Sequence, residues 1–216
     1  MGILSEFDKH VIDTLRDAKV LDNNDARKLS APNGVIVIPC SDGDQMTDVF
    51  THQQRLALEG GWPVRPHMPS LHGGAMLIAE KCPLYREYRV DELFLQHIRE
   101  ASSPALKGIG TVILYVHAPC GAAGLAGLTL VQQIAFLMRA KERVKEQSDE
   151  YNVICFVHVD YGEGRKRTYF ISRVTWLAFW NAQGRTLWGH LFAEDPFPAS
   201  KKKKQFSKTM FLPSND

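Results

Sequence analysis

The sequence has few cysteines and no long apolar run, and each shortage excludes a class of protein. Only four cysteines occur in 216 residues, at Cys40, Cys82, Cys120 and Cys155. They are too few and too scattered for a disulfide scaffold, so metal binding, catalysis or simple burial is the expected use of the thiols. No apolar stretch approaches the roughly 20 residues needed to cross a bilayer, and acids stand near the N-terminus where a signal peptide would be basic. We therefore expect a cytoplasmic protein without membrane contact.

The charge balance selects no class of partner. The chain carries 26 basic and 24 acidic residues, a formal net charge of +2. The longest basic run, Lys201–Lys204, is typical of a solvated tail, so nucleic-acid binding is not expected. A length of 216 residues suits one hydrophobic core with appendages. We divide the chain into an N-terminal helical arm (1–33), an α/β core (34–172) and a C-terminal extension with the basic tail (173–216).

Hydrophobic patterning predicts the elements of the core. Helical periodicity predicts helices at residues 4–20, 48–58, 88–102 and 125–145. Continuous apolar runs, which suit strands covered on both faces, predict strands at residues 35–38, 111–116 and 152–159. Residues 167–171 are expected to pair after a glycine-containing turn. This alternation of strands and helices predicts an α/β fold with a mainly parallel central sheet flanked by helices.

Two further segments lie outside this alternation. Gly73 and Gly74 stand beside an apolar run, so the backbone there is expected to approach a site or another chain closely. Near the C-terminus, the aromatic segments 174–180 and 185–192 flank a polar stretch and are expected to form either an aromatic hairpin or an irregular arm.

Chemically reactive side chains follow two of the predicted strands. Cys40 closes the first strand, with Asp42 two residues later, and His117 and Cys120 follow the second. In open α/β sheets, the carboxyl ends of parallel strands line the ligand crevice. Zinc held by two thiolates and one imidazole keeps a fourth position free for water, which is a catalytic ligand set. Cys40, His117 and Cys120 are therefore a candidate Zn²⁺ site, and Gly121 lets the backbone come close to the metal.

The two motifs together resemble those of the β-carbonic anhydrases. The stretch CSDGD at 40–44 is similar to the family pattern C-x-D-x-R, and HAPCG at 117–121 is similar to H-x-x-C-G. The likeness extends over roughly residues 34–171. It implies a Zn²⁺ ion on Cys40, His117 and Cys120, and reversible hydration of carbon dioxide to bicarbonate. It also implies a homodimer or higher homo-oligomer.

The chain departs from the family at one functional position. In the family, the arginine two residues after the acid pairs with that acid and keeps it off the metal, whereas here the position is Asp44. Asp42, the candidate catalytic carboxylate, therefore either binds the metal as a fourth ligand or stays free beside Asp44, unless Arg65 or Arg86 replaces the missing partner. The loop 72–75 also lacks the family's arginine and asparagines. Gly121 is the candidate substrate-binding residue.

The sequence is also compatible with other functions. One alternative is a non-catalytic zinc-binding homologue, and another is a hydrolase of a small electrophile such as a carbon–sulfur analogue. Gly121, Gly124 and Gly127 after a strand are also compatible with a nucleotide-phosphate loop, although the spacing lacks the usual first G-x-G. Cys120 with His117 would suit a thiol nucleophile, which leaves Cys40 and Asp42 unexplained. His158, inside an apolar strand, is expected to be a satisfied core histidine.

Overall fold

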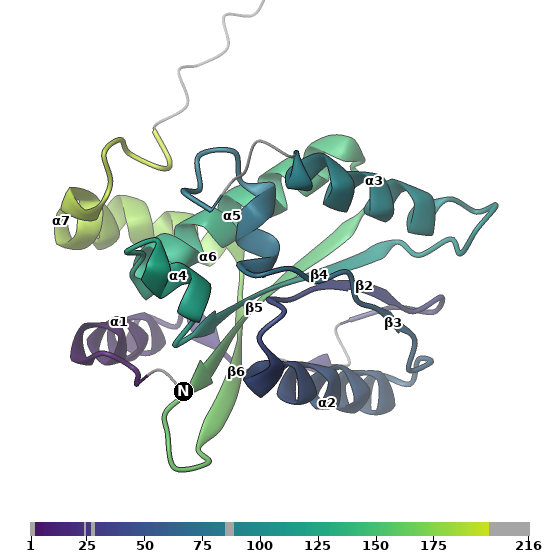
Figure 1. Ribbon diagram of the computed structural model, residues 1–216, viewed down its shortest axis with the longest axis horizontal. Helices are drawn as coiled ribbons and strands as arrows, with labels where there is room; N and C mark the ends of the chain where they lie inside the picture. The colour runs from purple at the N-terminus through teal and green to yellow at the C-terminus, as the bar shows by residue number, and fades with distance from the viewer. Residues whose placement is uncertain (1–2, 24, 27–28, 85–88, 199–216) are drawn as a thin grey trace, which may run out of the picture.

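A computed structural model describes residues 3–23, 25–26, 29–84 and 89–198 (Figure 1). The order of strands and helices follows the predicted alternation. The strands are β1 (Leu21–Asp22), β2 (Val35–Ile38), β3 (Pro66–His67), β4 (Thr111–Ala118), β5 (Asn152–Asp160) and β6 (Lys166–Ile171). The helices are α1 (Glu6–Asp17), α2 (Gly43–Gly60), the 3-10 helix η2 (Gly74–Ile78), α3 (Val90–Ser102), α4 (Gly121–Leu125), α5 (Leu130–Gln147), α6 (Arg173–Phe179), the π-helical η3 (Trp180–Gly184), α7 (Arg185–Trp188) and the 3-10 helix η4 (Gly189–Leu191).

The six strands form one mixed sheet in the order β1-β6-β5-β4-β2-β3. β3, β2, β4 and β5 are parallel, whereas β6 is antiparallel to β5 and β1 is antiparallel to β6. The predicted α/β fold is confirmed. The prediction of a mainly parallel sheet needs correction, because the sheet is mixed. A short turn at 161–165 joins β5 to β6, and a connection this short can only return the chain antiparallel, because a parallel crossover needs a dozen or more residues.

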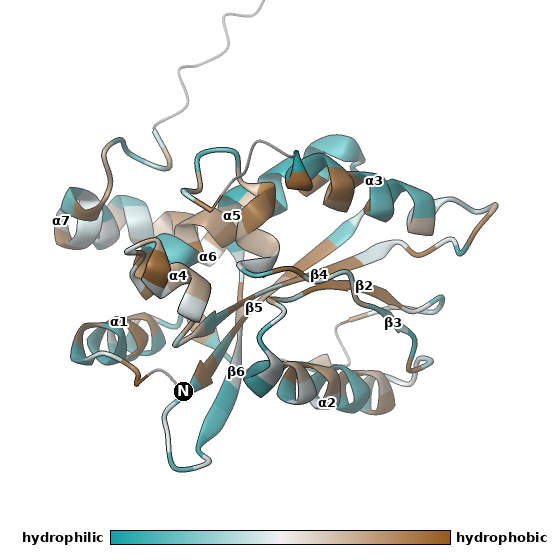
Figure 2. Ribbon diagram, viewed as in Figure 1, coloured by the Kyte–Doolittle hydropathy of each residue, from teal (hydrophilic) through white to brown (hydrophobic). Residues whose placement is uncertain are grey.

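Helices cover both faces of the sheet, and the sheet separates two hydrophobic clusters. The larger cluster joins the sheet to α1, α3 and α5, and the smaller cluster lies between the sheet and α2. Figure 1 shows α2 on the opposite side of the strands from α3 and α5. The central strands are hydrophobic along their length, as strands covered on both faces should be, and the helices carry mixed stripes (Figure 2).

Capping groups decide where two of the helices begin. Asp42 caps α2, so this helix starts five residues before the predicted range. Thr129 and Gln132 form a capping box at the start of α5. The predicted helix 125–145 is therefore preceded by a separate short helix, α4, and Gly127 with φ +66° lies between the two.

The C-terminal aromatic segment is helical, so the expected hairpin or irregular arm is wrong. Ser172 caps α6, and Trp176, Phe179 and Trp180 follow one another at helical spacing, which places their rings together. These rings belong to the larger core cluster, as do Val11, Ile12 and Leu15 of α1. The basic run Lys201–Lys204 lies outside the described residues. Among the described helices, none is both long and apolar enough to span a membrane.

A candidate metal centre

Three predicted ligands come from the carboxyl ends of two neighbouring strands. Cys40 follows β2 and forms an isolated parallel bridge with Leu71. His117 is the last residue but one of strand β4, and Cys120 is the residue before α4. Because β2 and β4 are adjacent and parallel, their carboxyl ends meet at one edge of the sheet. Residues nearly 80 positions apart in sequence thereby become neighbours.

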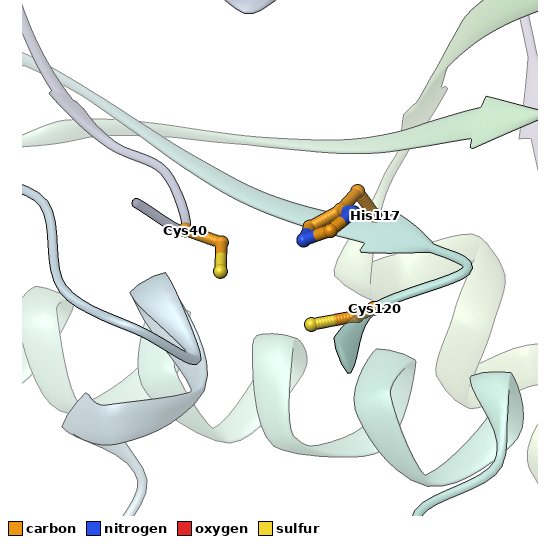
Figure 3. Close-up of side chains that lie close together, drawn as sticks. All are labelled: Cys40, His117 and Cys120. Atoms are coloured by element: carbon orange, nitrogen blue, oxygen red, sulfur yellow. The ribbon is translucent and has the colours of Figure 1, made fainter. Parts of the chain in front are cut away.

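The three side chains converge on one point (Figure 3). One ligand atom from each of Cys40, His117 and Cys120 lies within 4.8 Å of the other two. All three residues are buried, with exposed fractions of 7%, 5% and 7%. This buried group can hold a metal ion, because its spacing suits ligand atoms that share one ion at about 2.0–2.3 Å.

The donor chemistry of the group also fits a metal. Both ring nitrogens of His117 are buried and have no hydrogen-bond partner among the described residues. A buried polar atom without a partner is costly, and coordination of an ion would satisfy one of these nitrogens. Two thiolates and an imidazole are ligands that zinc prefers, as are other borderline or soft metals.

The two thiols differ in how readily they lose their protons. A hydrogen bond from Cys120, assisted by the neighbouring His117 and the Gly73 N–H, lowers the pKa of Cys40 despite its burial. The same hydrogen bond, together with burial, raises the pKa of Cys120. Since the thiolate is the form that binds metal, uptake of an ion would release the Cys120 proton.

The glycine pair after Leu71 closes the site from one side. The Gly73 N–H donates to Cys40 Sγ at 3.3 Å. Gly74 has φ +52°, and a Cβ there would lie 2.5 Å from the backbone nitrogen of Cys40. Only a glycine permits this approach, so the close backbone contact expected from the sequence is present beside the first thiol ligand.

Asp42 lies beside the three ligands without being one of their group. Its Oδ1 accepts the Asp44 N–H at 3.0 Å, which caps α2, and its Oδ2 is 3.9 Å from His117 Nε2. No arginine of the described residues pairs with Asp42: Arg65 is not within ion-pair distance, and Arg86 lies outside those residues. The Asp44 carboxylate does not replace the missing partner, because it has the same charge as Asp42.

Gly121 and His72 lie at the margin of the centre. Gly121 begins α4 and is exposed, and a Cβ at this position would meet nothing within 4 Å. Its role in substrate binding stays a prediction, without a steric need for glycine. His72 is exposed, and its Nδ1 is 3.2 Å from Ser41 Oγ.

A polar layer between α2 and the sheet had no signal in the periodicity of the sequence. The Tyr115 hydroxyl lies 2.6 Å from His52 Nδ1 and accepts from Gln53 Nε2 at 2.5 Å. His158 Nδ1 lies 2.8 Å from Thr168 Oγ1. Burial lowers the pKa of both His52 and His158 to about 4, so both rings are neutral near pH 7.

The same layer borders a surface cavity of about 460 Å³, lined by residues of α2, β6 and His158. Lys166 bonds Asp48 at 2.6 Å on its wall. His158 Nε2 has no hydrogen-bond partner within the described part of the chain and is 4.0 Å from Asp48 Oδ2, so the predicted core histidine is buried but only half satisfied there.

Comparison with known proteins identifies no relative of this chain. No family model, no curated protein and no solved structure matches the chain. The function must therefore be inferred from the geometry and chemistry of the centre itself.

Proposed function

We propose that the protein is a zinc-dependent hydratase of carbonic anhydrase type, which converts carbon dioxide and water reversibly to bicarbonate. The observation that carries the proposal is the buried group of Cys40, His117 and Cys120, with ligand atoms all within 4.8 Å of one another. Three protein ligands leave one position of a tetrahedral ion for water, as in catalytic zinc sites. The resemblance of the two motifs to those of β-carbonic anhydrases supports the same assignment.

Bound Zn²⁺ would supply a water whose pKa falls from 15.7 to about 7. The chain's own residues would then orient groups bound beside the ion and tune its ligands. Asp42 Oδ2, 3.9 Å from His117 Nε2, is near enough to accept a hydrogen bond from a group on the open side of the ligands. The Gly73 N–H withdraws charge from Cys40 Sγ through its hydrogen bond.

Two cavities of the molecule lie outside the ligand group. The cavity of about 460 Å³ beside α2 and a second cavity of about 620 Å³ between α5 and the C-terminal segment are lined by other residues. Neither includes Cys40, His117 or Cys120 in its lining. The choice of a small substrate, carbon dioxide or a carbon–sulfur analogue of similar size, depends on the resemblance of the motifs and not on either cavity.

One observation favours a second candidate, a zinc protein without hydratase activity. Asp42 has no arginine partner among the described residues, and its free oxygen already lies beside the ligand group. Without that partner, the carboxylate is free to bind the metal and occupy the position that water needs. A closed four-ligand site is typical of structural zinc.

Stopped-flow hydration of carbon dioxide by the metal-loaded and chelator-treated protein tests the proposal. We expect metal-dependent hydration and about one zinc per chain, as a three-ligand site requires. Asp42→Asn is the matched variant, because asparagine caps helices as well as aspartate does but is a poor zinc ligand. A closed site predicts no hydration by the wild type and weaker zinc binding by D42N. An open site predicts wild-type hydration that D42N reduces with zinc content unchanged. A wild type that binds no zinc contradicts both candidates.

A further inference from the structure

The orientation of the His117 ring needs an explanation. Histidine ligands almost always donate their second ring nitrogen to a carboxylate, a carbonyl or a water, which fixes the ring in place. In this chain neither ring nitrogen of His117 has a hydrogen-bond partner among the described residues. Asp42 Oδ2, at 3.9 Å, is too distant for a hydrogen bond. Side chains that lie beside His117 on the same face of the sheet can also restrict its ring.

Strand register supplies one neighbour. His117 of β4 is the direct partner of His158 of β5 in a parallel pairing. Side chains of register partners stand side by side on the same face of a sheet. That face is the one under α2, because Tyr115 and Phe156, two residues before each histidine, both belong to the core cluster beneath that helix. The two histidines are therefore paired across the strands, and both side chains lie on the face of the sheet under α2.

His158 is itself held in place from the next strand. Thr168 of β6 is its register partner, and Thr168 Oγ1 lies 2.8 Å from His158 Nδ1. The ring of His158 is 3% exposed, so it has little room to turn. Thr168, His158 and His117 thus form one row across three strands, anchored by a hydrogen bond at the β6 end and ending at the metal centre.

We propose that His158, fixed by Thr168, is a positioning residue that orients the imidazole of His117 for metal binding. The inference rests on the proposed metal centre and deepens it. It assigns a role to the buried histidine of β5, which is not one of the three candidate ligands.

A pair of substitutions at Thr168 tests the row without removing either histidine. Thr168→Val keeps the shape of the side chain and removes the hydroxyl, whereas Thr168→Ser keeps the hydroxyl. The measurements are zinc affinity, by competition with a chromogenic chelator, and the visible absorption spectrum of the Co²⁺-substituted protein. We expect T168V to weaken zinc binding by about tenfold or more and to alter the Co²⁺ bands, as loss of outer partners does in zinc enzymes. T168S should stay close to the wild type in both measurements.

His158→Gln provides a second, independent variant and should weaken zinc binding as T168V does. A purely structural role would lower the melting temperature of T168V and leave zinc affinity and the Co²⁺ spectrum of the folded protein unchanged, and that result would overturn the inference. T168S as weak as T168V would also overturn it. A wild type that binds neither ion would overturn the metal centre and the inference together, so the two failures are distinguishable.

Discussion

Asp42 has two roles that compete for one side chain. One oxygen caps α2 through the Asp44 N–H, and the other lies 3.9 Å from His117 Nε2. A helix cap contributes typically about 1 kcal/mol, so the cap alone holds the carboxylate only weakly against a metal ion. An arginine partner would hold the carboxylate in an ion pair and away from the ligand group. If the proposed metal centre exists, we expect this missing partner to decide whether the fourth position of the ion stays open.

Replacing Asp44 by arginine should supply the missing charge. We expect Asp44→Arg to raise the rate of carbon dioxide hydration by about tenfold, because a guanidinium paired with Asp42 would keep that carboxylate off the metal and leave the fourth position to water. Asp44→Gln is the control, since it removes the acid without adding a cation. Stopped-flow rates measured at equal zinc content provide the comparison. Equal rates for D44R and D44Q would show that the guanidinium has no effect.

Removing one thiol ligand should abolish metal binding. Cys120→Ser is expected to lower bound zinc from about one equivalent per chain to a small fraction, because serine is a far poorer zinc ligand than thiolate. Cys155→Ala is the control: Cys155 is a fully buried thiol of β5, and burial raises its pKa to about 12, which keeps it protonated. Metal analysis after gel filtration under reducing conditions gives the stoichiometry. Retention of zinc by C120S would rule out the proposed ligand set.

At the scale of elements, the loop before η2 and the end of β2 work as a unit. The bridge between Cys40 and Leu71 and the hydrogen bond from the Gly73 N–H hold the loop against the first thiol. Gly74 makes that contact close enough to exclude any side chain. The loop therefore helps to set the position of Cys40 beside the end of β2.

A pair of glycine substitutions separates this contact from ordinary backbone strain. Gly74→Ala combines a positive φ with a Cβ 2.5 Å from Cys40 N, and should lower the free energy of unfolding by roughly 2–4 kcal/mol. Gly61→Ala also has a positive φ but meets nothing within 4 Å, so it should cost only about 1 kcal/mol. Urea denaturation gives both values, and zinc affinity should fall only in G74A. Equal losses in the two variants would mean that the contact with Cys40 is unimportant.

At the scale of the whole molecule, one sheet separates an apolar core from a layer that contains buried polar groups. The face under α1, α3 and α5 is filled with hydrophobic side chains, whereas the face under α2 also holds His52, Tyr115 and the two adjacent histidines. Imidazoles buried in their neutral form make folding sensitive to acid, because the unfolded chain binds protons that the folded chain excludes.

His52 should make the stability of the protein depend on pH between about 6.5 and 4. Its pKa falls from 6.5 in the unfolded chain to about 4 in the folded protein, chiefly because of burial. Its contribution is therefore complete above pH 6.5 and is lost as the pH falls toward 4. Urea titrations of the chelator-treated protein and of His52→Gln should show a shallower loss of stability in the variant across this range. Parallel curves for the two proteins would contradict the assignment of a neutral, half-buried His52.

Much of the fold could be predicted from local patterns. Val35–Ile38 and the long apolar runs of β4 and β5 have the signature of covered parallel strands, and the structure places strands there. Trp176, Phe179 and Trp180 have helical spacing, but the polar stretch after them favours a hairpin or an irregular arm, whereas the structure has a helix there. The cap at Asp42 and the break at Gly127 place helix boundaries several residues from the predicted ones. Periodicity alone does not specify where a helix begins or ends.

Local patterns in the sequence predict most strands and helices of the core and the chemistry of the candidate ligands: apolar runs form strands, and thiols and an imidazole at strand ends are suited to a metal. Which groups meet depends on the tertiary structure. The pairing of β2 with β4 brings Cys40 to Cys120, the register of β5 sets His158 beside His117, and the short turn to β6 makes the sheet mixed. Such contacts join residues that are far apart in the chain, and they depend on strand order and register, which no local pattern of residues encodes.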